Sequence, residues 1–219
     1  MGVEPENTLR SFVRAERSGM DVIALDLQLS KDGVLVVLHD AEVDRTTDGS
    51  GAVADLTVAE LRELDAGQGE HVPVFEEVLG AVRTPFQVSV QSGAVAAALA
   101  ELVRRHDLST RVEVASFDDE VLAETARLVP GVRSCLYADG HLPHRRPIVD
   151  RALAVGAGTV ALDIRELTLD TVESVHAAGL RVTGWTVNTL QQLRLARALE
   201  LDGATTDFPE IRSTGRFIA

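Results

Sequence analysis

The sequence predicts an α/β fold in which parallel strands alternate with helices. Short runs rich in β-branched residues recur along all 219 residues, and helix-like stretches separate them, a pattern typical of βα units. Hydrophobic residues make up 45% of the chain and charged residues 25%, which is enough apolar surface for one sizeable core. We therefore expect a single domain over residues 1–219.

The expected strands follow the apolar runs, and the first two form a hairpin. Asp32-Gly33 is a favoured turn pair, so we read Lys31-Asp32-Gly33 as the turn between them. In chain order the strands are Val22–Leu29, Val34–His39, Phe86–Gln91, Val112–Phe117, Arg133–Ala138, Thr159–Ile164, Arg181–Val187 and Ala204–Phe208. With the hairpin counted as one unit, they supply seven parallel strands.

Helix-like stretches alternate with these strands. They are Asn7–Ser18, Val58–Leu64, Glu76–Val82, Ala94–Arg105, Asp119–Leu128, Ile148–Ala154, Leu169–Ala177 and Leu190–Leu199. Asn7 or Thr8 can cap the first helix. Glycines that suit a left-handed C-terminal position follow three of the helices, at Gly19, Gly156 and Gly179.

The seven expected parallel strands are one fewer than a closed (β/α)8 barrel needs. A (β/α)8 barrel needs eight parallel strands, and only MGVE precedes the Pro5-Glu6-Asn7 start of the first helix. Either the chain closes in an unusual way or it lacks an N-terminal strand. A missing strand exposes two edges that can pair with another chain, so we expect a homo-oligomer as one outcome.

Composition excludes several classes of partner. Lys and Arg number 21 against 34 Asp and Glu, a formal charge of −13, which argues against binding to nucleic acid or an anionic bilayer. No apolar run is long enough to span a membrane, and the start MGVEPENT has no signal-peptide features. Cys135 is the only cysteine, so no internal disulfide is possible and a cytoplasmic location is expected.

A series of short motifs runs along the whole chain. They are Pro5-Glu6-Asn7-Thr8, Leu25-Asp26, Leu38-His39-Asp40, Asp44-Arg45-Thr46-Thr47-Asp48-Gly49, Ser116-Phe117-Asp118, Trp185-Thr186-Val187-Asn188 and Thr206-Asp207-Phe208-Pro209. In this order and spacing the series resembles the glycerophosphodiester phosphodiesterase family. The resemblance implies a TIM-type (β/α)8 barrel, here without its first strand. It also implies hydrolysis of glycerophosphodiesters to glycerol 3-phosphate and an alcohol.

The resemblance further implies a cofactor and roles for individual residues. The family uses two histidines as general acid and base, together with a divalent cation, Mg2+ or Ca2+, held by carboxylates. A hard cation screens the charge of the phosphodiester, and imidazoles near neutrality transfer protons. Carried over to this sequence, His39 is the catalytic residue, Asp26 is a metal ligand and Trp185 contacts the substrate. Asp44 and Arg45 are expected to brace the loop after His39.

The chain departs from the family at several of these positions. The family's strand ending in His-Arg-Gly has no counterpart, so one histidine is absent. Ala24, Ser89 and Gln91 stand where the family carries Glu, Glu and Lys. Because both charge signs are removed together, the pocket need not hold an unpaired buried charge. We expect metal binding to be weak or lost and catalysis to be impaired or lost, as in a pseudoenzyme.

Strand periodicity groups the same positions independently. Ala24, Asp26 and Gln28 share one face of their strand, and Ser89 and Gln91 share one face of the next. We therefore expect Gln28, Ser89 and Gln91 to line the mouth of the barrel and to contact substrate.

Two alternatives to catalysis stay open. The emptied pocket could hold a polyol or a phosphoester ligand without turning it over, or the barrel could be a scaffold with no ligand. A separate loop, Asp139–Arg146, carries two histidines and two arginines after a strand. It would either rebuild an anion or metal site or lie solvated at the surface.

Overall fold

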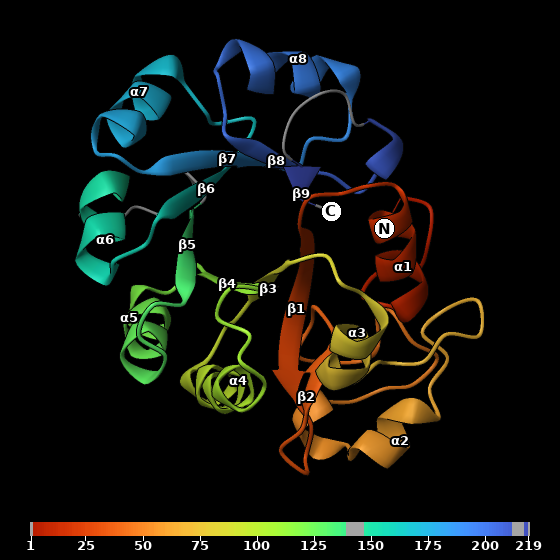
Figure 1. Ribbon diagram of the computed structural model, residues 1–219. Helices are drawn as coiled ribbons and strands as arrows, with labels where there is room; N and C mark the ends of the chain where they lie inside the picture. The colour runs from red at the N-terminus through yellow and green to blue at the C-terminus, as the bar shows by residue number, and fades with distance from the viewer. Residues whose placement is uncertain (1, 139–146, 212–216, 219) are drawn as a thin grey trace.

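The computed structural model describes residues 2–138, 147–211 and 217–218, and its centre is one curled sheet (Figure 1). The strands run in the order β2-β1-β3-β4-β5-β6-β7-β8-β9. Their bounds are β1 Ile23–Leu29, β2 Leu35–Val37, β3 Phe86–Ser89, β4 Val112–Ser116, β5 Arg133–Ala138, β6 Thr159–Asp163, β7 Arg181–Trp185, β8 Gly203–Thr205 and β9 Phe217–Ile218.

Helices cover the outside of this sheet, as in a (β/α) barrel (Figure 1). Their bounds are α1 Leu9–Arg17, α2 Val58–Arg62, α3 Phe75–Ala81, α4 Gly93–His106, α5 Asp119–Leu128, α6 Ile148–Val155, α7 Leu169–Ala177 and α8 Leu190–Ala198. Two short 3-10 helices, Val53–Asp55 and Pro209–Ile211, complete the described elements. Within the described ranges, no helix has the length and apolar character needed to cross a bilayer.

The expected parallel strands are present, and one further strand joins them. β1 and β3 to β8 are parallel neighbours, which confirms the seven expected from the sequence. β9 pairs in parallel with β8, at Ala204 with Phe217, and sequence analysis did not predict it. No described strand precedes α1, and the sheet begins at β2 and ends at β9 instead of closing on itself.

The alternation expected for β1 is visible in its burial. Ile23, Leu25 and Leu27 are fully buried beneath the helices, while Asp26 and Gln28 are only partly buried. Successive side chains of a strand point to opposite faces, so the polar set faces the interior of the curl. This places the half-buried polar groups of β1 inside the barrel, near the carboxyl end of the strand.

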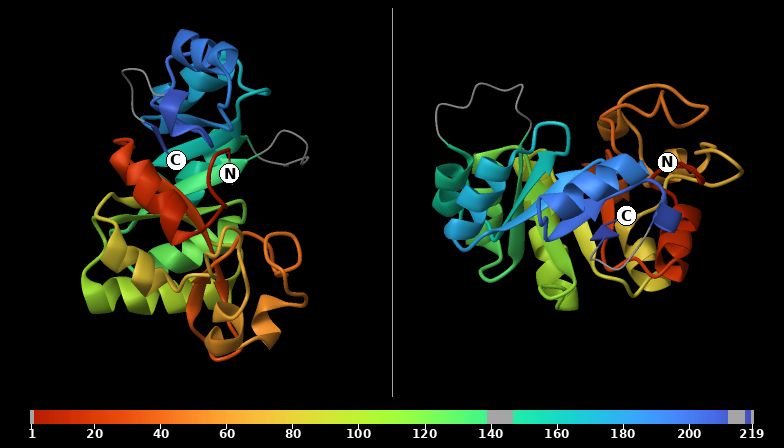
Figure 2. Two further views of the ribbon diagram at one scale, coloured as in Figure 1. Left: turned by 90° about the vertical axis from the view of Figure 1, so that its right-hand side faces the viewer. Right: turned by 90° about the horizontal axis from the view of Figure 1, so that it is seen from above.

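A small second core supports the segment between β2 and α3. Val36, Val53 and Leu61 are buried in it, apart from the main core between sheet and helices. This segment projects beyond the sheet and carries the loop after His39 (Figure 2). The hairpin that starts it is confirmed: β1 and β2 are antiparallel, and Gly33 has φ +76°, which favours glycine at this turn.

Local capping decides where the first helix begins. Thr8 is the N-cap, and its hydroxyl accepts from the Ser11 N–H. Asn7 instead takes a left-handed conformation with φ 55°. Several predicted strands were too long: the second ends at Val37, the third at Ser89 and the seventh at Trp185. The residues beyond these ends leave the ladder to form the loops at the mouth of the barrel.

Candidate active site at the carboxyl ends of the strands

The candidate site lies where β1 and β3 end and where the chain emerges from β2. In parallel α/β sheets and barrels, loops at the carboxyl ends of the strands form the functional site. Asp26 lies on the interior face of β1, and its backbone carbonyl accepts a hydrogen bond from Leu38 N–H at 3.1 Å. That bond brings the start of the His39 loop against β1.

Asn7 holds the carboxylate of Asp26. The Asn7 side chain is buried, and its Nδ2 donates to Asp26 Oδ2 at 3.2 Å. Because Thr8 caps α1, the Asn7 side chain is free to make this contact from a left-handed backbone. The first loop of the chain is thereby attached to the interior face of β1.

His39 sits at the rim with its backbone fixed and one ring nitrogen bound. Gln28 Nε2 donates to the His39 carbonyl at 3.0 Å, and His39 Nδ1 lies 2.6 Å from Asp40 Oδ1. The hydrogen bond to Asp40 raises the pKa of His39 above its usual value, and the nearby Asp26 carboxylate adds to this effect. The side chain of His39 is 53% exposed.

Asp40 is ionised and therefore decides which nitrogen of His39 carries the proton. Hydrogen bonds from Arg45 and His39 lower the pKa of Asp40 to about 2. An ionised carboxylate only accepts, so the proton between the two groups belongs to His39 Nδ1. When the ring is neutral, Nε2 is an acceptor, and when it is protonated, Nε2 is a donor.

Arg45 connects this pair to the start of the chain. Its Nε donates to Asp40 Oδ2 at 2.6 Å and its Nη2 to Asp40 Oδ1 at 3.1 Å. On its other side, Nη1 and Nη2 donate to the Glu6 carboxylate at 3.0 and 2.5 Å. Asp44 braces the same loop by accepting from Gly51 N–H at 2.9 Å. These contacts agree with the expected bracing role.

The interior next to β3 is polar and internally bonded. Ser89 and Gln87 are buried on the same strand, and Gln91 lies exposed beyond its end. Tyr137 OH donates to Gln87 Oε1 at 2.7 Å, and Gln87 Nε2 donates to Glu113 Oε2 at 2.9 Å. A chain of hydrogen bonds thus runs from β5 through β3 to β4, inside the barrel.

Aromatic side chains form the wall on the far side of the mouth. Trp185, at the end of β7, packs near the small buried residues Ala115, Cys135 and Ala161. Its ring lies 6.0 Å from that of Phe117, which in turn lies 5.2 Å from Tyr137. The indole Nε1 is buried and finds no hydrogen-bond partner in the described part of the chain.

The donor set does not fit a hard divalent cation. Mg2+ and Ca2+ require several oxygen ligands, usually from more than one carboxylate. In residues 2–138, 147–211 and 217–218, no three His, Cys, Asp or Glu side chains are grouped so as to hold a metal ion. Ala24 shares the interior face of β1 with Asp26 but offers no oxygen from its side chain. The loop Asp139–Arg146 lies outside the described residues.

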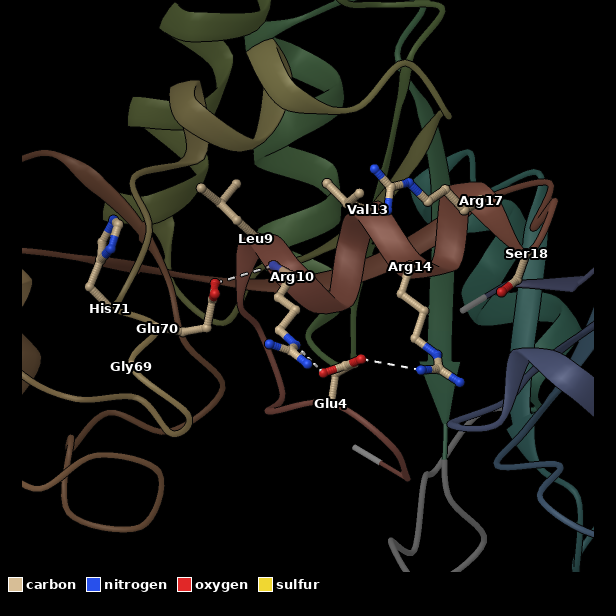
Figure 3. A pocket seen from close by; sticks show the side chains of 10 residues that line it. All are labelled: Glu4, Leu9, Arg10, Val13, Arg14, Arg17, Ser18, Gly69, Glu70 and His71. Atoms are coloured by element: carbon tan, nitrogen blue, oxygen red, sulfur yellow. Dashed lines mark hydrogen bonds and ion pairs between the residues drawn. The ribbon is translucent and has the colours of Figure 1, made fainter.

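Two hollows lie away from this site. A cavity of about 670 Å3 lies on the outer side of α1 (Figure 3), where Glu4 bridges Arg10 and Arg14. Another, of about 360 Å3, lies at the amino ends of the strands, where Glu113 is bonded to Arg181. The charged groups in both are largely paired within the protein, so neither resembles a prepared ligand site.

Sequence reasoning missed two of the contacts that organise the mouth. It assigned no partner to Asn7, whose amide holds Asp26. It also missed Asn188, whose Nδ2 donates to Asp207 Oδ2 at 2.7 Å. Both belong to motifs that were recognised, so the motifs signalled importance without revealing the pairing. Cys135 is fully buried, and burial raises the pKa of its thiol.

Comparisons with known proteins agree with one another. The model of the glycerophosphoryl diester phosphodiesterase family matches residues 2–211. A glycerophosphodiester phosphodiesterase of Caldanaerobacter subterraneus is 32% identical over 94% of this chain and 90% of its own length. One from Bacillus subtilis is 29% identical over 96% and 81%.

Solved structures show the same likeness. A phosphodiesterase of Oleispira antarctica, in complex with the product sn-glycerol-3-phosphate, matches with a TM-score of 0.87 at 25% identity, covering 95% of this chain and 90% of its own. A glycerophosphodiester phosphodiesterase of Thermotoga maritima matches with a TM-score of 0.83 at 26% identity, covering 96% and 92%.

Proposed function

Because this chain belongs to the glycerophosphoryl diester phosphodiesterase family, we propose that its site is built for glycerophosphodiesters and that their hydrolysis is impaired or lost in this chain. The family reaction gives glycerol 3-phosphate and an alcohol. One observation supports the proposal: the loop of the His39–Asp40 pair and the carboxylate of Asp26 meet at one mouth. Ala24 and Ser89 stand where the resemblance to the family implies further carboxylates.

His39 is the acid or base in this proposal. With its proton held on Nδ1 by Asp40, Nε2 can take a proton from a nucleophile or give one to a leaving oxygen. One imidazole cannot do both in a single concerted step, and the absence of a general acid or base typically costs about 100- to 10,000-fold in rate. We therefore propose at most a weak reaction from the described residues at this mouth.

The metal is part of the proposal only by family membership. When bound, Mg2+ or Ca2+ would supply charge screening at the phosphate. Asp26 is the residue of this chain that would contact it, and Asn7 already occupies one oxygen of that carboxylate. Because one carboxylate is a poor site for a hard cation, we propose that metal binding is weak or lost.

A non-catalytic binding role is the second candidate. Gln28, Ser89 and Gln91 are neutral hydrogen-bonding groups, suited to hydroxyls or phosphate oxygens, and Trp185 supplies an aromatic wall. We propose a polyol or a phosphoester as the ligand. The bound sn-glycerol-3-phosphate of the Oleispira antarctica phosphodiesterase makes that compound the first ligand to test.

The experiment measures turnover and binding on one preparation. Release of glycerol 3-phosphate is followed for several glycerophosphodiesters with Mg2+, with Ca2+ and with EDTA, and binding of glycerol 3-phosphate by calorimetry. His39→Asn is compared with His106→Asn, which alters another exposed histidine that is paired with a glutamate. The family site requires that only His39→Asn affects turnover or binding.

Each outcome selects one of the candidates. Metal-dependent turnover at ordinary enzyme rates overturns the proposed impairment. Binding without turnover supports the non-catalytic role. Neither binding nor turnover overturns both candidates and leaves a scaffold without ligand.

Three further expectations belong to this proposal. Residues 1–219 act as one domain, which a single unfolding transition would support. The chain associates with itself through a sheet edge, which solution mass would test. A cytoplasmic location fits a protein whose one cysteine, Cys135, is a buried thiol.

A further inference from the structure

Arg45 occupies the centre of a chain of charged groups that ends on His39. Its guanidinium makes two contacts with Asp40 and two with Glu6, at 2.5 to 3.1 Å. Both carboxylates are therefore bound in a two-point arrangement. Asp40 in turn contacts His39 Nδ1 at 2.6 Å. Asp40 and Arg45 follow His39 in one loop, whereas Glu6 lies 39 residues before Arg45 and is brought to it by the fold.

The geometry requires an arginine. A guanidinium is planar and presents five N–H donors along two edges, so it can bind a carboxylate on each side at once. A lysine carries the same charge on a single nitrogen and cannot hold two carboxylates in fixed planes. The arrangement thus fixes the orientation of Asp40, and a positive charge alone would not.

Stability is a poor explanation for this network. The side chain of Arg45 is 50% exposed, and exposed ion pairs contribute little to folding because water and salt screen them. The network does restrict the orientation of the Asp40 side chain. If Asp40 could rotate, its Oδ1 would move away from Nδ1 of His39, and the His39 ring could then change its tautomer and rotate.

The network also joins the two halves of the mouth. Glu6 precedes Asn7, whose amide holds Asp26. Arg45 therefore links the loop that holds Asp26 to the loop that carries His39. A displacement of either loop would change the distance between the carboxylate of Asp26 and the imidazole of His39.

We propose that Arg45 is a positioning residue: by binding Glu6 and Asp40 together, it keeps Asp40 on Nδ1 of His39 and presents Nε2 of His39 to the mouth of the barrel. This role rests on the proposed function of His39 as the working imidazole. The arrangement itself is a property of the protein without ligand, and it can be measured whether or not the protein turns a substrate over.

The test reads the tautomer of His39 directly. Proton–nitrogen correlation spectra of the imidazoles are recorded at a pH where the rings are neutral, and His39 is assigned from the spectrum of His39→Asn. The unchanged protein is expected to show the proton of His39 on Nδ1. Arg45→Gln is expected to show a mixture of the two tautomers. Arg45→Lys is expected to resemble Arg45→Gln, because it keeps the positive charge but loses the planar guanidinium with N–H donors along two edges.

A matched control separates positioning from loss of a surface charge. Arg62→Gln removes another arginine of similar exposure, 48%, which is paired with Glu77. It should leave the His39 spectrum unchanged. All variants should melt at nearly the temperature of the unchanged protein. Glu6→Gln weakens one side of the network and should give an intermediate spectrum, which keeps the test valid if Arg45→Gln does not fold.

Two results overturn the inference. One is an unchanged His39 spectrum in Arg45→Gln, and the other is full retention of the Nδ1 tautomer in Arg45→Lys. Where turnover is measurable, Arg45→Gln should lower kcat by about 10- to 100-fold with little change in KM, as loss of a partner that orients a histidine does in metal sites. Failure of the proposed function would instead appear as absent turnover and absent binding in the unchanged protein.

Discussion

Glu113 provides a sharp test of how the barrel interior is held together. The residue is buried at the start of β4, and its carboxylate accepts from Gln87, Thr159 and Arg181 at 2.9 to 3.2 Å. Gln87 passes the connection on to Tyr137 at the mouth. We expect Glu113→Ala to destabilise the fold far more than removal of a surface carboxylate.

The magnitude follows from what each partner loses. Gln87 is only 1% exposed, so its orphaned Nε2 would cost about 1–3 kcal/mol. Arg181 is 43% exposed and can return to water, which discounts the loss of the ion pair to about 0.5–1 kcal/mol. Thr159 keeps Arg181 as a partner at 2.8 Å. The free energy of unfolding should fall by about 1.5–4 kcal/mol.

Glu113→Gln should cost less, about 1–2 kcal/mol. The NH2 group of the new glutamine would face the NH2 group of Gln87, and both are donors, so the Gln87 amide must flip to present its oxygen. The Gln87 NH2 group then points to Tyr137, whose hydroxyl can accept that hydrogen bond instead of donating one. Urea denaturation measures both variants, with the slope expected to stay constant. Glu101→Ala, which removes an exposed partner of Arg105, is the control and should cost under about 0.5 kcal/mol. An equal decrease in the free energy of unfolding in Glu113→Ala and Glu101→Ala would refute the reasoning.

Four further predictions concern Asp40, Cys135 and Phe75. Asp40→Asn should lower the pKa of His39, because the carboxylate that raises it is gone, and an NMR titration that shows no decrease would contradict this assignment. Asp40 has a pKa of about 2 in the folded protein against an ordinary value of 3.8, so its ionised form stabilises the fold above about pH 4. This stabilisation is lost as the pH falls toward 2. A plot of the free energy of unfolding against pH should therefore fall less steeply in acid for Asp40→Asn than for the unchanged protein. Cys135 should resist thiol reagents in the folded protein and react in denaturant; rapid labelling without denaturant would show that the core opens. Phe75→Ala should cost about 3–5 kcal/mol, because Phe75 is fully buried edge-to-face on Phe86, and a loss under about 1 kcal/mol by urea denaturation would contradict that packing.

Much of the candidate site could be predicted because its signals are local. The alternation in β1 separates Asp26 and Gln28 from the apolar residues between them, and burial in the structure follows it. The hairpin turn at Gly33 and the left-handed glycine at Gly156 are likewise set by short stretches of chain. Boundaries were less accurate, since the ends of strands depend on where neighbouring loops leave the ladder.

Pairings between distant segments could not be predicted in the same way. Nothing near Arg45 in the sequence names Glu6 as its second partner, and nothing near Asn7 names Asp26. β9 joins β8 through only two residues, Phe217 and Ile218, and a run this short does not predict a strand. Such contacts depend on how the whole sheet curls, which brings loops from different strands to one edge.

By itself, the sequence determined the alternation of strands and helices, the family, and the identity of the groups at the mouth. Periodicity and motif spacing encode these features, because each depends on residues close together in the chain. Only the tertiary structure decided which groups meet: that Asp40 is held by Arg45, that Asp26 is held by Asn7, and that β9 is the last strand of the described sheet. The physical reason is that hydrogen bonds and ion pairs act over a few ångströms, and folding alone sets which distant residues come within that range.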